Sequence, residues 1–564
     1  MTSGSTGSTF PSWQLAILMG APVAIGLGYL YLRSSSNKTK REVEQKLALE
    51  KKALSLDESV ADEQQGPSSQ DPFEKAKSYK SQGNGLFKDG KYDEAIKMYR
   101  KAIDECPKDK TADIATYYQN CAAAYEQLKR WSKVKQECTM ALELNPKYIK
   151  ALSRRARAYE NTHDLEECLE DITAVCILEG FENQTSLVTA DRILKQLGRL
   201  HAQQAIKNRT PVMPSNNFIK SYFSSFSEDP CKTTVINHSS DEPLKGFARA
   251  KNALKNEDFD TIIPACTEEI ECSEAEAQYK MEALVLRATF YLLVGQHDEA
   301  LVDFDVVISN NDARRKVRVN ALIKRATLYM QQEKVDQCLA DFKTAAELDD
   351  QNPDVFHHRG QVHLLMSSIE DAKSDFEKAV KLNPNFPIAY VQKIYTDHRY
   401  AFTIKDMNKA KEIIGAFENA IKKFPTCTEC YTLYAQVLCD QRQYSKADSY
   451  FSKAIEIEPT NAIVYVHKGL LRLQWTGDVD TAVQLINEAI SIDPKCEFGY
   501  ETLGTIEVQR GNLERAIEMF EKALLLAKTE MEMTHLFSLK DAAVAQLKVA
   551  KKYGGSIQNV TGLM

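Results

Sequence analysis

Small and apolar residues recur at a fixed spacing along most of the chain. A small residue is followed twelve positions later by another small or apolar residue, as Gly83 is by Ala95 and Ala122 is by Val134. Two antiparallel helices that pack closely need small side chains where they cross, so the pattern predicts repeated helix–turn–helix units. The first positions of these units are Gly83, Ala122, Ala156, Ala250, Ala288, Ala326, Gly360, Ile394, Ala435, Gly469 and Gly504.

Successive first positions lie 34 to 41 residues apart within two blocks. This spacing resembles the tetratricopeptide repeat, which implies an all-α fold of stacked helix pairs that form a superhelix with a concave face. We count about eleven repeats in two arrays, three at 74–180 and eight at 245–530. The eighth unit is irregular.

The segments between and after the arrays read differently. Residues 181–244 form a linker with one helix at about Asp191 to Lys207, and then a loop rich in Pro, Ser and Asn from Thr210 to Pro243, which we expect to be mobile. Residues 531–564 read as a C-terminal capping helix and tail, because the end of an array must be covered by a helix that is polar outside.

The N-terminal part of the chain predicts one transmembrane helix. Residues 13–32, WQLAILMGAPVAIGLGYLYL, carry no charge and are long enough for a single pass. Basic residues follow this segment, so the positive-inside rule places the bulk of the chain in the cytosol. Residues 1–12 are then a short non-cytosolic N-terminus, and residues 33–73 are a charged flexible tether.

Composition narrows the class of function. There are 72 Lys and Arg against 79 Asp and Glu, a net charge of −7, so no overall basic field exists to bind nucleic acid. The 13 cysteines are an odd number without framework spacing and suggest free thiols in a reducing compartment. We find no catalytic, metal or cofactor motif, and we interpret the Cys427–Cys430 pair and the adjacent His357 and His358 as structural. The chain therefore does not read as an enzyme.

The first array carries a set of cationic and amide side chains at positions expected to face the groove, which we call the clamp residues: Lys80, Asn84, Asn120, Lys150 and Arg154. This set could bind two adjacent carboxylates through charge-assisted hydrogen bonds. It resembles the dicarboxylate clamp of co-chaperone tetratricopeptide domains, which implies binding of the C-terminal Glu-Glu-Val-Asp tails of seventy- and ninety-kilodalton heat-shock chaperones. Neighbouring Arg155 and Arg157 are interpreted as surface charges.

The corresponding positions of the last repeats form an apolar strip with isolated acids. Such a strip suits an amphipathic helix that bears basic residues, and a mitochondrial targeting segment is such a helix. The precursor-binding residues that we predict are Val391, Tyr395, Glu429, Leu433, Ile463, Val466, His467, Leu470, Phe498 and Glu501.

The order of anchor, clamp, linker and long array resembles the seventy-kilodalton receptors of the mitochondrial outer-membrane import machinery. Passages such as YVHKGLLRLQW, from Tyr465 to Trp475, and YETLGTIEVQRGN, from Tyr500 to Asn512, are similar to that family. The resemblance implies a single-pass protein of the mitochondrial outer membrane with its N-terminus in the intermembrane space. Its implied partners are the heat-shock chaperones, precursors including carriers, and other translocase subunits. The alternative is a chaperone-docking adaptor or scaffold on the endoplasmic reticulum or another cytosol-facing membrane.

Overall fold

The computed structural model describes residues 71–236, 244–272 and 278–554. The predicted transmembrane segment at 13–32 lies outside these residues. Among the helices of the described part, none is both long enough and apolar enough to cross a membrane.

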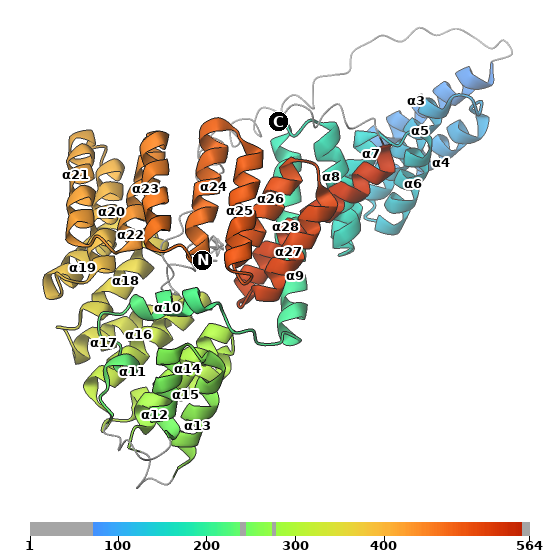
Figure 1. Cartoon of the computed structure of the whole chain (residues 1–564). Helices are drawn as coiled ribbons and strands as arrows, with labels where there is room; N and C mark the ends of the chain where they lie inside the picture. Colours follow the sequence, from blue (N-terminus) through green and yellow to red (C-terminus); the bar gives the residue numbers. More distant parts are fainter. Residues whose placement is uncertain (1–70, 237–243, 273–277, 555–564) are drawn as a thin grey trace. The chain divides into compact units, whose positions relative to one another are not determined.

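The described residues are α-helical and contain no strand, which confirms the predicted fold class (Figure 1). Three antiparallel pairs come first, and the single helix α9 (Gln184–Lys207) follows them. These three pairs are α3 (Pro72–Lys88) with α4 (Tyr92–Glu105), α5 (Thr111–Gln127) with α6 (Trp131–Leu144), and α7 (Ile149–Asn161) with α8 (Leu165–Leu178).

Eight further pairs and a last helix, α28 (Glu530–Tyr553), complete the chain. The eighth pair of the whole chain is irregular because both of its helices have 17 residues. The eight pairs are α12 (Gly246–Asn256) with α13 (Ile262–Glu271), α14 (Lys280–Val294) with α15 (His297–Ser309), α16 (Arg315–Gln331) with α17 (Val335–Leu348), α18 (Pro353–Leu365) with α19 (Ile369–Leu382), α20 (Pro387–Thr403) with α21 (Met407–Lys423), α22 (Thr428–Asp440) with α23 (Tyr444–Ile457), α24 (Ala462–Thr476) with α25 (Val479–Ile492), and α26 (Glu497–Gln509) with α27 (Leu513–Leu526); a short 3₁₀ turn, η1 (Phe259–Thr261), precedes α13.

The small first position of each repeat is explained by the aromatic ring that packs on it. A Cβ atom built at Gly83 would lie 2.6 Å from Cε1 of Tyr99, which comes from the second helix of the same pair. At Gly504 the corresponding distance to Cε1 of Phe520 is 2.7 Å. These distances are shorter than van der Waals contact, so the helices can cross this closely only where the side chain is missing or small.

A second regular feature is a buried ion pair between the two helices of a unit. Nε of Arg155 donates to Asp171 at 2.6 Å, and both side chains are buried. The interpretation of Arg155 as a surface charge is therefore wrong, whereas Arg157 is exposed as predicted. The same pairing, with the aspartate 16 residues after the arginine, joins Arg287 to Asp303, Arg325 to Asp341, and Arg359 to Asp375.

The chain divides into two compact units. The described part of the N-terminal unit consists of residues 71–204, 504–521 and 534–554, and the central unit consists of residues 205–503 and 522–533. This division differs from the linear order of the repeats, because most of α28 belongs to the N-terminal unit. There, Ala545 and Val549 of α28 share a hydrophobic core with Leu197 of α9.

The linker after α9 is ordered where we predicted a mobile loop. Residues 210–236 contain α10 (Asn216–Ser224) and α11 (Pro230–Thr233), and the side chains of Tyr222, Phe223 and Cys231 are buried in the core of the central unit. The prediction of a mobile loop is therefore wrong for these residues, because their aromatic side chains are buried rather than exposed to solvent. We call residues 209–236 the strap.

All thirteen cysteines lie in the described residues and are free thiols, as the sequence predicts. Burial raises the pKa of several of these thiols, including Cys121 and Cys338, both to about 12. These groups are therefore protonated at neutral pH and act as small apolar side chains in the helix packing.

Candidate functional site

The five predicted clamp residues lie on the first helices of three consecutive pairs in the N-terminal unit. Lys80 and Asn84 are on α3, Asn120 is on α5, and Lys150 and Arg154 are on α7. Lys150 is exposed and the other four are half-buried. No described residue forms an ion pair with the side chains of Lys80 and Lys150, so both ammonium groups are available to an anionic ligand.

The other cationic member, Arg154, is held by a carboxylate that sequence reasoning missed. Its Nε donates to Glu126 of α5 at 2.7 Å, and Nη1 of Arg157 donates to the other oxygen of that carboxylate at 2.5 Å. Nη1 of Arg154 is buried and has no hydrogen-bond partner among the described residues. The guanidinium is thus fixed in position while part of its donor capacity is unused.

Asn84 is oriented by the tyrosine that packs against Gly83. The hydroxyl of Tyr99 donates to Oδ1 of Asn84 at 2.9 Å. Burial raises the pKa of Tyr99 to about 12, so the hydroxyl keeps its proton and remains a donor. With Oδ1 engaged, the amide of Asn84 has its N–H groups left for an acceptor such as a carboxylate.

The central unit contains a cavity of about 690 Å³. Its walls come from the strap and from the N-terminal ends of the first helices of the last repeats. A volume of this size accommodates several side chains of a bound segment. The array side of the cavity includes Phe386, Pro387, Ile388, Thr428, Glu429, Ala462, Ile463, Glu497, Phe498 and Glu501.

Four of the ten predicted precursor-binding residues line this cavity: Glu429, Ile463, Phe498 and Glu501. The first three are the second residues of α22, α24 and α26, so they lie at helix ends that are open to the cavity.

The other six predicted residues lie in the helix packing, outside the cavity. All six are at the fifth residue of their helices or beyond, a depth that Glu501 shares although it lines the cavity. Burial lowers the pKa of His467 to about 4, so its ring is neutral at physiological pH. Val391, Tyr395, Leu433, Val466 and His467 are buried, and Leu470 is half-buried against the same core.

Acidic side chains outnumber basic ones around the cavity. Burial raises the pKa of Glu429, and it raises that of Glu497 well above its ordinary value, with the nearby Glu532 acting in the same direction. An acidic cavity with aromatic and aliphatic walls favours a ligand that carries both positive charge and apolar surface. The acids are Glu429, Glu458, Asp493, Glu497, Glu501 and Glu532, and the bases are Lys220, Lys495 and Lys528.

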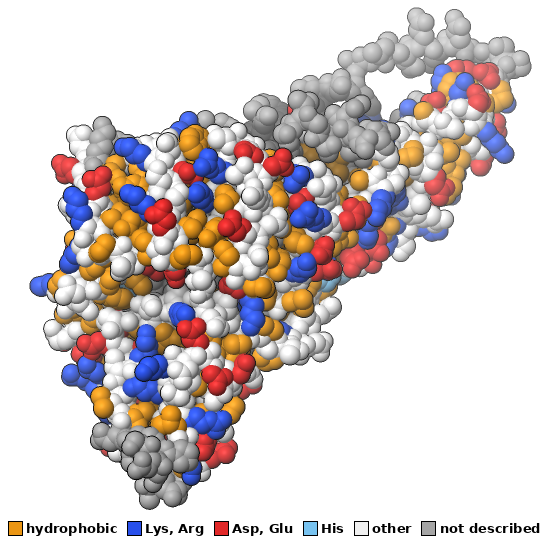
Figure 2. Space-filling view, viewed as in Figure 1, with side chains coloured by type: hydrophobic (Ala, Val, Ile, Leu, Met, Phe, Trp, Pro, Cys, Tyr) orange, Lys and Arg blue, Asp and Glu red, His pale blue; other side chains and the backbone are white. Residues whose placement is uncertain are grey.

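On the viewed face of the molecule, acidic and basic side chains are interspersed among hydrophobic ones (Figure 2). The net charge of −7 therefore does not describe either candidate site, and the position of each charge decides which ligand it favours.

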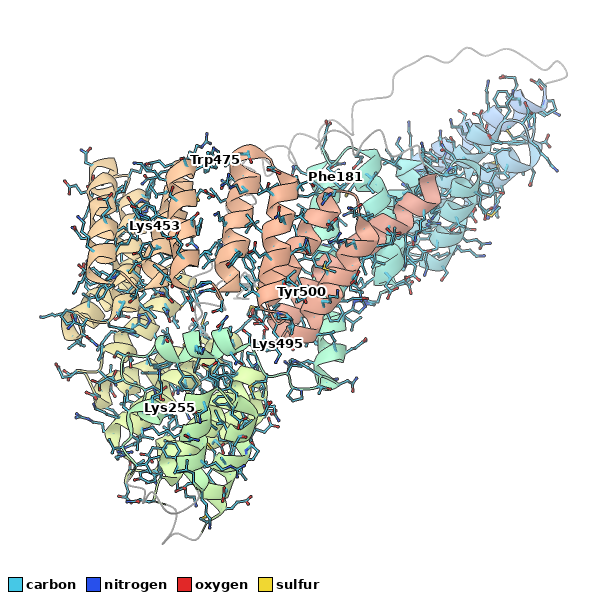
Figure 3. The ribbon with its side chains drawn as sticks, in the orientation of Figure 1. Phe181, Lys255, Lys453, Trp475, Lys495 and Tyr500 are labelled. Carbon is cyan, nitrogen blue, oxygen red and sulfur yellow. The ribbon has the colours of Figure 1, made fainter. Side chains whose placement is uncertain are left out.

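Sequence reasoning missed the strap side of the cavity. The sequence does contain a sign of a helix with a buried face there. Inside the segment that we read as a loop, the aromatic residues follow helical spacing: Phe218, Tyr222, Phe223 and Phe226. It also missed Lys495, labelled in Figure 3, and Lys528, both of which line the cavity.

Comparison with known proteins first shows which class of repeat protein this chain belongs to. Sequence models of the tetratricopeptide repeat match residues 76–109, 353–386, 428–461 and 499–530. Together with the eleven helix pairs in the described residues, these matches place the chain among the tetratricopeptide-repeat proteins.

Comparison of the whole sequence with known proteins then shows the protein family. The chain is 48% identical to the rat mitochondrial import receptor subunit TOM70, over 98% of this chain and 94% of that protein. It is also 48% identical to the human protein of the same name, over 96% of this chain and 93% of that protein. The crystal structure of yeast Tom70 aligns with 85% of this chain and 98% of its own, at 24% identity and a TM-score of 0.48. The chain belongs to the TOM70 family of mitochondrial import receptor subunits.

Proposed function

We propose that this import receptor uses two separate sites, one for chaperones and one for precursors. The N-terminal unit docks cytosolic heat-shock chaperones by their Glu-Glu-Val-Asp tails, and the cavity of the central unit binds hydrophobic precursors that those chaperones deliver. Family membership, at 48% identity over nearly the whole chain, is the observation that carries the receptor assignment.

The chaperone part of the proposal rests on the arrangement of donors on α3, α5 and α7. Lys80, Lys150 and Arg154 supply three cations, and Asn84 and Asn120 supply amide donors. A peptide that ends in aspartate presents two carboxylates at its last residue. Charge-assisted hydrogen bonds to such carboxylates contribute about 1.5–3 kcal/mol each, so a few of them give micromolar affinity.

The precursor part rests on the chemistry of the cavity. Glu429 and Glu501 offer carboxylates, and Ile463 and Phe498 offer apolar surface beside them. An amphipathic helix with basic residues on one face and apolar residues on the other satisfies both features. The six predicted residues in the helix packing then support these walls rather than contact the precursor.

Residues 13–32 are proposed as the anchor in the mitochondrial outer membrane, with the N-terminus in the intermembrane space. This orientation leaves both units in the cytosol, where chaperones and newly made precursors are present. Other translocase subunits are the partners that receive the precursor from the receptor.

Calorimetric titration of a Glu-Glu-Val-Asp peptide into the full chain tests the clamp. We expect Arg154→Ala to weaken binding by about 1.5 kcal/mol or more, which is more than tenfold in Kd, because a charged donor to the ligand is lost. The matched control is Arg130→Ala, which removes the same charge from an exposed arginine that pairs with Asp93 and lies outside α3, α5 and α7. Equal affinities of the wild type and Arg154→Ala would contradict the proposal.

A further inference from the structure

The strap is attached to the last repeats at its first half. Nζ of Lys495, in the loop before α26, donates to the carbonyl oxygen of Met213 at 2.8 Å. Nδ2 of Asn217, at the start of α10, donates to the carbonyl oxygen of Thr460 before α24. Two loops between repeats therefore hold this half of the strap against the array.

The second half of the strap is attached through buried charges. Asp229 accepts from Nζ of Lys324 at 2.8 Å, and both side chains are almost completely buried. The carboxylate of Asp354 accepts the backbone N–H groups of Ser227 at 2.7 Å and Glu228 at 3.2 Å. Since a buried charge that loses its partner is strongly unfavourable, this part of the strap cannot leave the array without a large cost.

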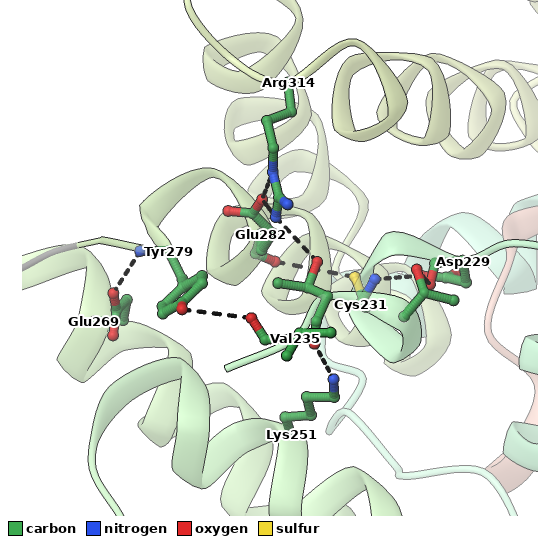
Figure 4. Close-up of polar contacts among 10 residues, drawn as sticks. Asp229, Cys231, Val235, Lys251, Glu269, Tyr279, Glu282 and Arg314 are labelled. Atoms are coloured by element: carbon green, nitrogen blue, oxygen red, sulfur yellow. Dashed lines mark hydrogen bonds and ion pairs between the residues drawn. The ribbon is translucent and has the colours of Figure 1, made fainter. Parts of the chain in front are cut away.

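The end of the strap is fixed by the contacts in Figure 4. Nη2 of Arg314 donates to the hydroxyl of Thr234 at 3.0 Å, and the ammonium of Lys251 donates to the carbonyl oxygen of the same residue. The side chain of Asp229 also accepts the backbone N–H of Cys231 at 2.8 Å and so caps α11. Side chains from α12, α16 and α18 thus hold the segment that follows α10.

Aromatic packing joins the two halves. The rings of Tyr222, Phe223 and Phe226 are buried, and all three surround the ammonium of Lys324 at 5.1–5.9 Å from their centroids. The ring of Phe223 also packs against Phe290 of α14 at 6.2 Å between centroids. The strap is therefore part of the core of the central unit and not a segment laid over its surface.

The same strap forms one wall of the cavity. Its residue Phe218 is half-buried at the edge of this core and also lines the cavity, and the ammonium of Lys528 lies 3.9 Å from the centroid of its ring. The strap residues of the wall include Met213, Pro214, Ser215, Phe218, Ser221 and Ser227.

We propose that the strap is a fixed wall of the precursor site and that Phe218 contacts the apolar face of the bound segment. This inference rests on the proposed function of the cavity. The choice of precursor then depends on the strap as well as on the repeats. The strap limits the cavity to the space between α10 and the last repeats. A bound segment must then have an apolar face that fits against Phe218 as well as against Ile463 and Phe498.

Fluorescence anisotropy with the full chain in lipid nanodiscs tests the inference. The probe is a labelled synthetic peptide of about 20 residues, with arginines on one helical face and leucines on the other. We expect Phe218→Ala and Phe498→Ala each to weaken binding roughly fivefold or more, since buried aromatic contacts dominate such interfaces. Lys232→Ala, an exposed strap position outside the cavity wall, is the control and should leave binding unchanged.

The two variants test the precursor site and the role of the strap separately. If Phe498→Ala weakens binding and Phe218→Ala does not, the strap is not part of the site, although the cavity still binds precursors. If neither variant weakens binding, the proposed precursor site is wrong, and this inference is wrong with it. A photoreactive phenylalanine analogue at position 218 should crosslink to the peptide, which tests the contact even if Phe218→Ala unfolds.

Hydrogen exchange distinguishes a strap that stays in place from one that moves away when the peptide binds. Hydrogen exchange of the backbone amides of residues 218–233 should be slow in the free chain, and just as slow when the peptide is saturating. Faster exchange on peptide binding would show that the strap leaves its place, and would overturn the inference.

Discussion

At the scale of single residues, buried charge is the feature that sets this chain apart from a plain stack of apolar helices. The pairs that begin with Arg155, Arg287, Arg325 and Arg359 occupy one register of the repeat. Each arginine directly precedes the small position, and its aspartate lies on the second helix. A bidentate pair of this kind fixes the rotation of one helix against the other, a constraint that apolar packing alone does not supply.

Buried histidine makes the central unit sensitive to acid. The ring of His467 lies near the rings of Phe451 and Phe498, at centroid distances of 6.2 and 5.5 Å. Its pKa is about 4 in the folded chain and about 6.5 when unfolded, so the unfolded state takes up the proton first as pH falls. The stabilisation that neutral His467 provides is complete above pH 6.5 and is lost as pH falls toward 4.

We expect acidification from pH 7 to pH 5 to lower the unfolding free energy of the central unit by about 2 kcal/mol through this residue. The measurement is urea unfolding of the wild type and His467→Phe at both pH values. The variant should lose less stability than the wild type, whereas His163→Asn, at an exposed histidine, should behave as the wild type does. An identical pH dependence for His467→Phe and the wild type would show that His467 is not buried and neutral as described.

Individual site residues were predictable only in part from the sequence. The clamp positions follow from register alone, because Lys80, Asn120 and Lys150 lie on the first helices of their pairs as the spacing requires. Glu126 was not predictable, because its role depends on which arginines reach it across α5 and α7. The positions of these residues do not test whether they bind the carboxylates of a chaperone tail. The peptide titration tests that prediction.

At the scale of elements, the crossing of two helices explains the small residues of the repeat. Gly83 and Gly85 lie on the same helix, α3, and differ in what surrounds them. A Cβ at Gly83 would meet the ring of Tyr99 at 2.6 Å, whereas a Cβ at Gly85 meets nothing within 4 Å. The two positions are therefore a matched pair for testing the packing argument.

We expect Gly83→Ala to destabilise the N-terminal unit by about 1–3 kcal/mol, because the tyrosine ring or the helix must move. Gly85→Ala should leave stability unchanged or raise it by up to about 1 kcal/mol, since alanine favours the helix more than glycine does. Thermal unfolding of both variants by circular dichroism provides the measurement. Equal effects of the two substitutions would mean that the glycine is not required by the crossing.

The strap shows where sequence reasoning about elements failed. Pro, Ser and Asn between residues 210 and 243 are typical of loops, and they outweighed the aromatic residues at helical spacing. Helix α10 has only 9 residues, too few to be stable without tertiary contacts. Its existence depends on the packing of Tyr222 and Phe223 against the array, which is a long-range interaction that local propensity does not contain.

At the scale of the whole molecule, the repeat period predicted the fold class and the number of helix pairs, because each unit repeats the same local interactions. It did not predict the division into two compact units. Residues 504–521 and most of α28 join the N-terminal unit, although they come last in the chain. That division depends on contacts such as Ser538 of α28 with Leu194 of α9, at 3.2 Å, between residues far apart in sequence.

The cavity that we propose as the precursor site matches the predicted residues only in part. Register placed ten residues on the inner side of the last repeats, and four of them line the cavity, three at the second residue of their helices and Glu501 at the fifth. The remaining six pack between helices instead, five of them buried and Leu470 half-buried. The other wall, formed by the strap, comes from a segment outside the repeats.

Our central proposal is that one chain carries both a chaperone-docking site and a separate precursor site, and that import uses both. Mitochondria that lack their own receptor are supplied with the wild-type chain, Arg154→Ala, Phe498→Ala or Arg130→Ala, and the initial import rate of a chaperone-delivered carrier precursor is measured. We predict that Arg154→Ala and Phe498→Ala each lower this rate roughly tenfold at limiting receptor, the factor expected for a loss of about 1.4 kcal/mol, while Arg130→Ala imports as the wild type does. Import at the wild-type rate by both Arg154→Ala and Phe498→Ala would contradict the account.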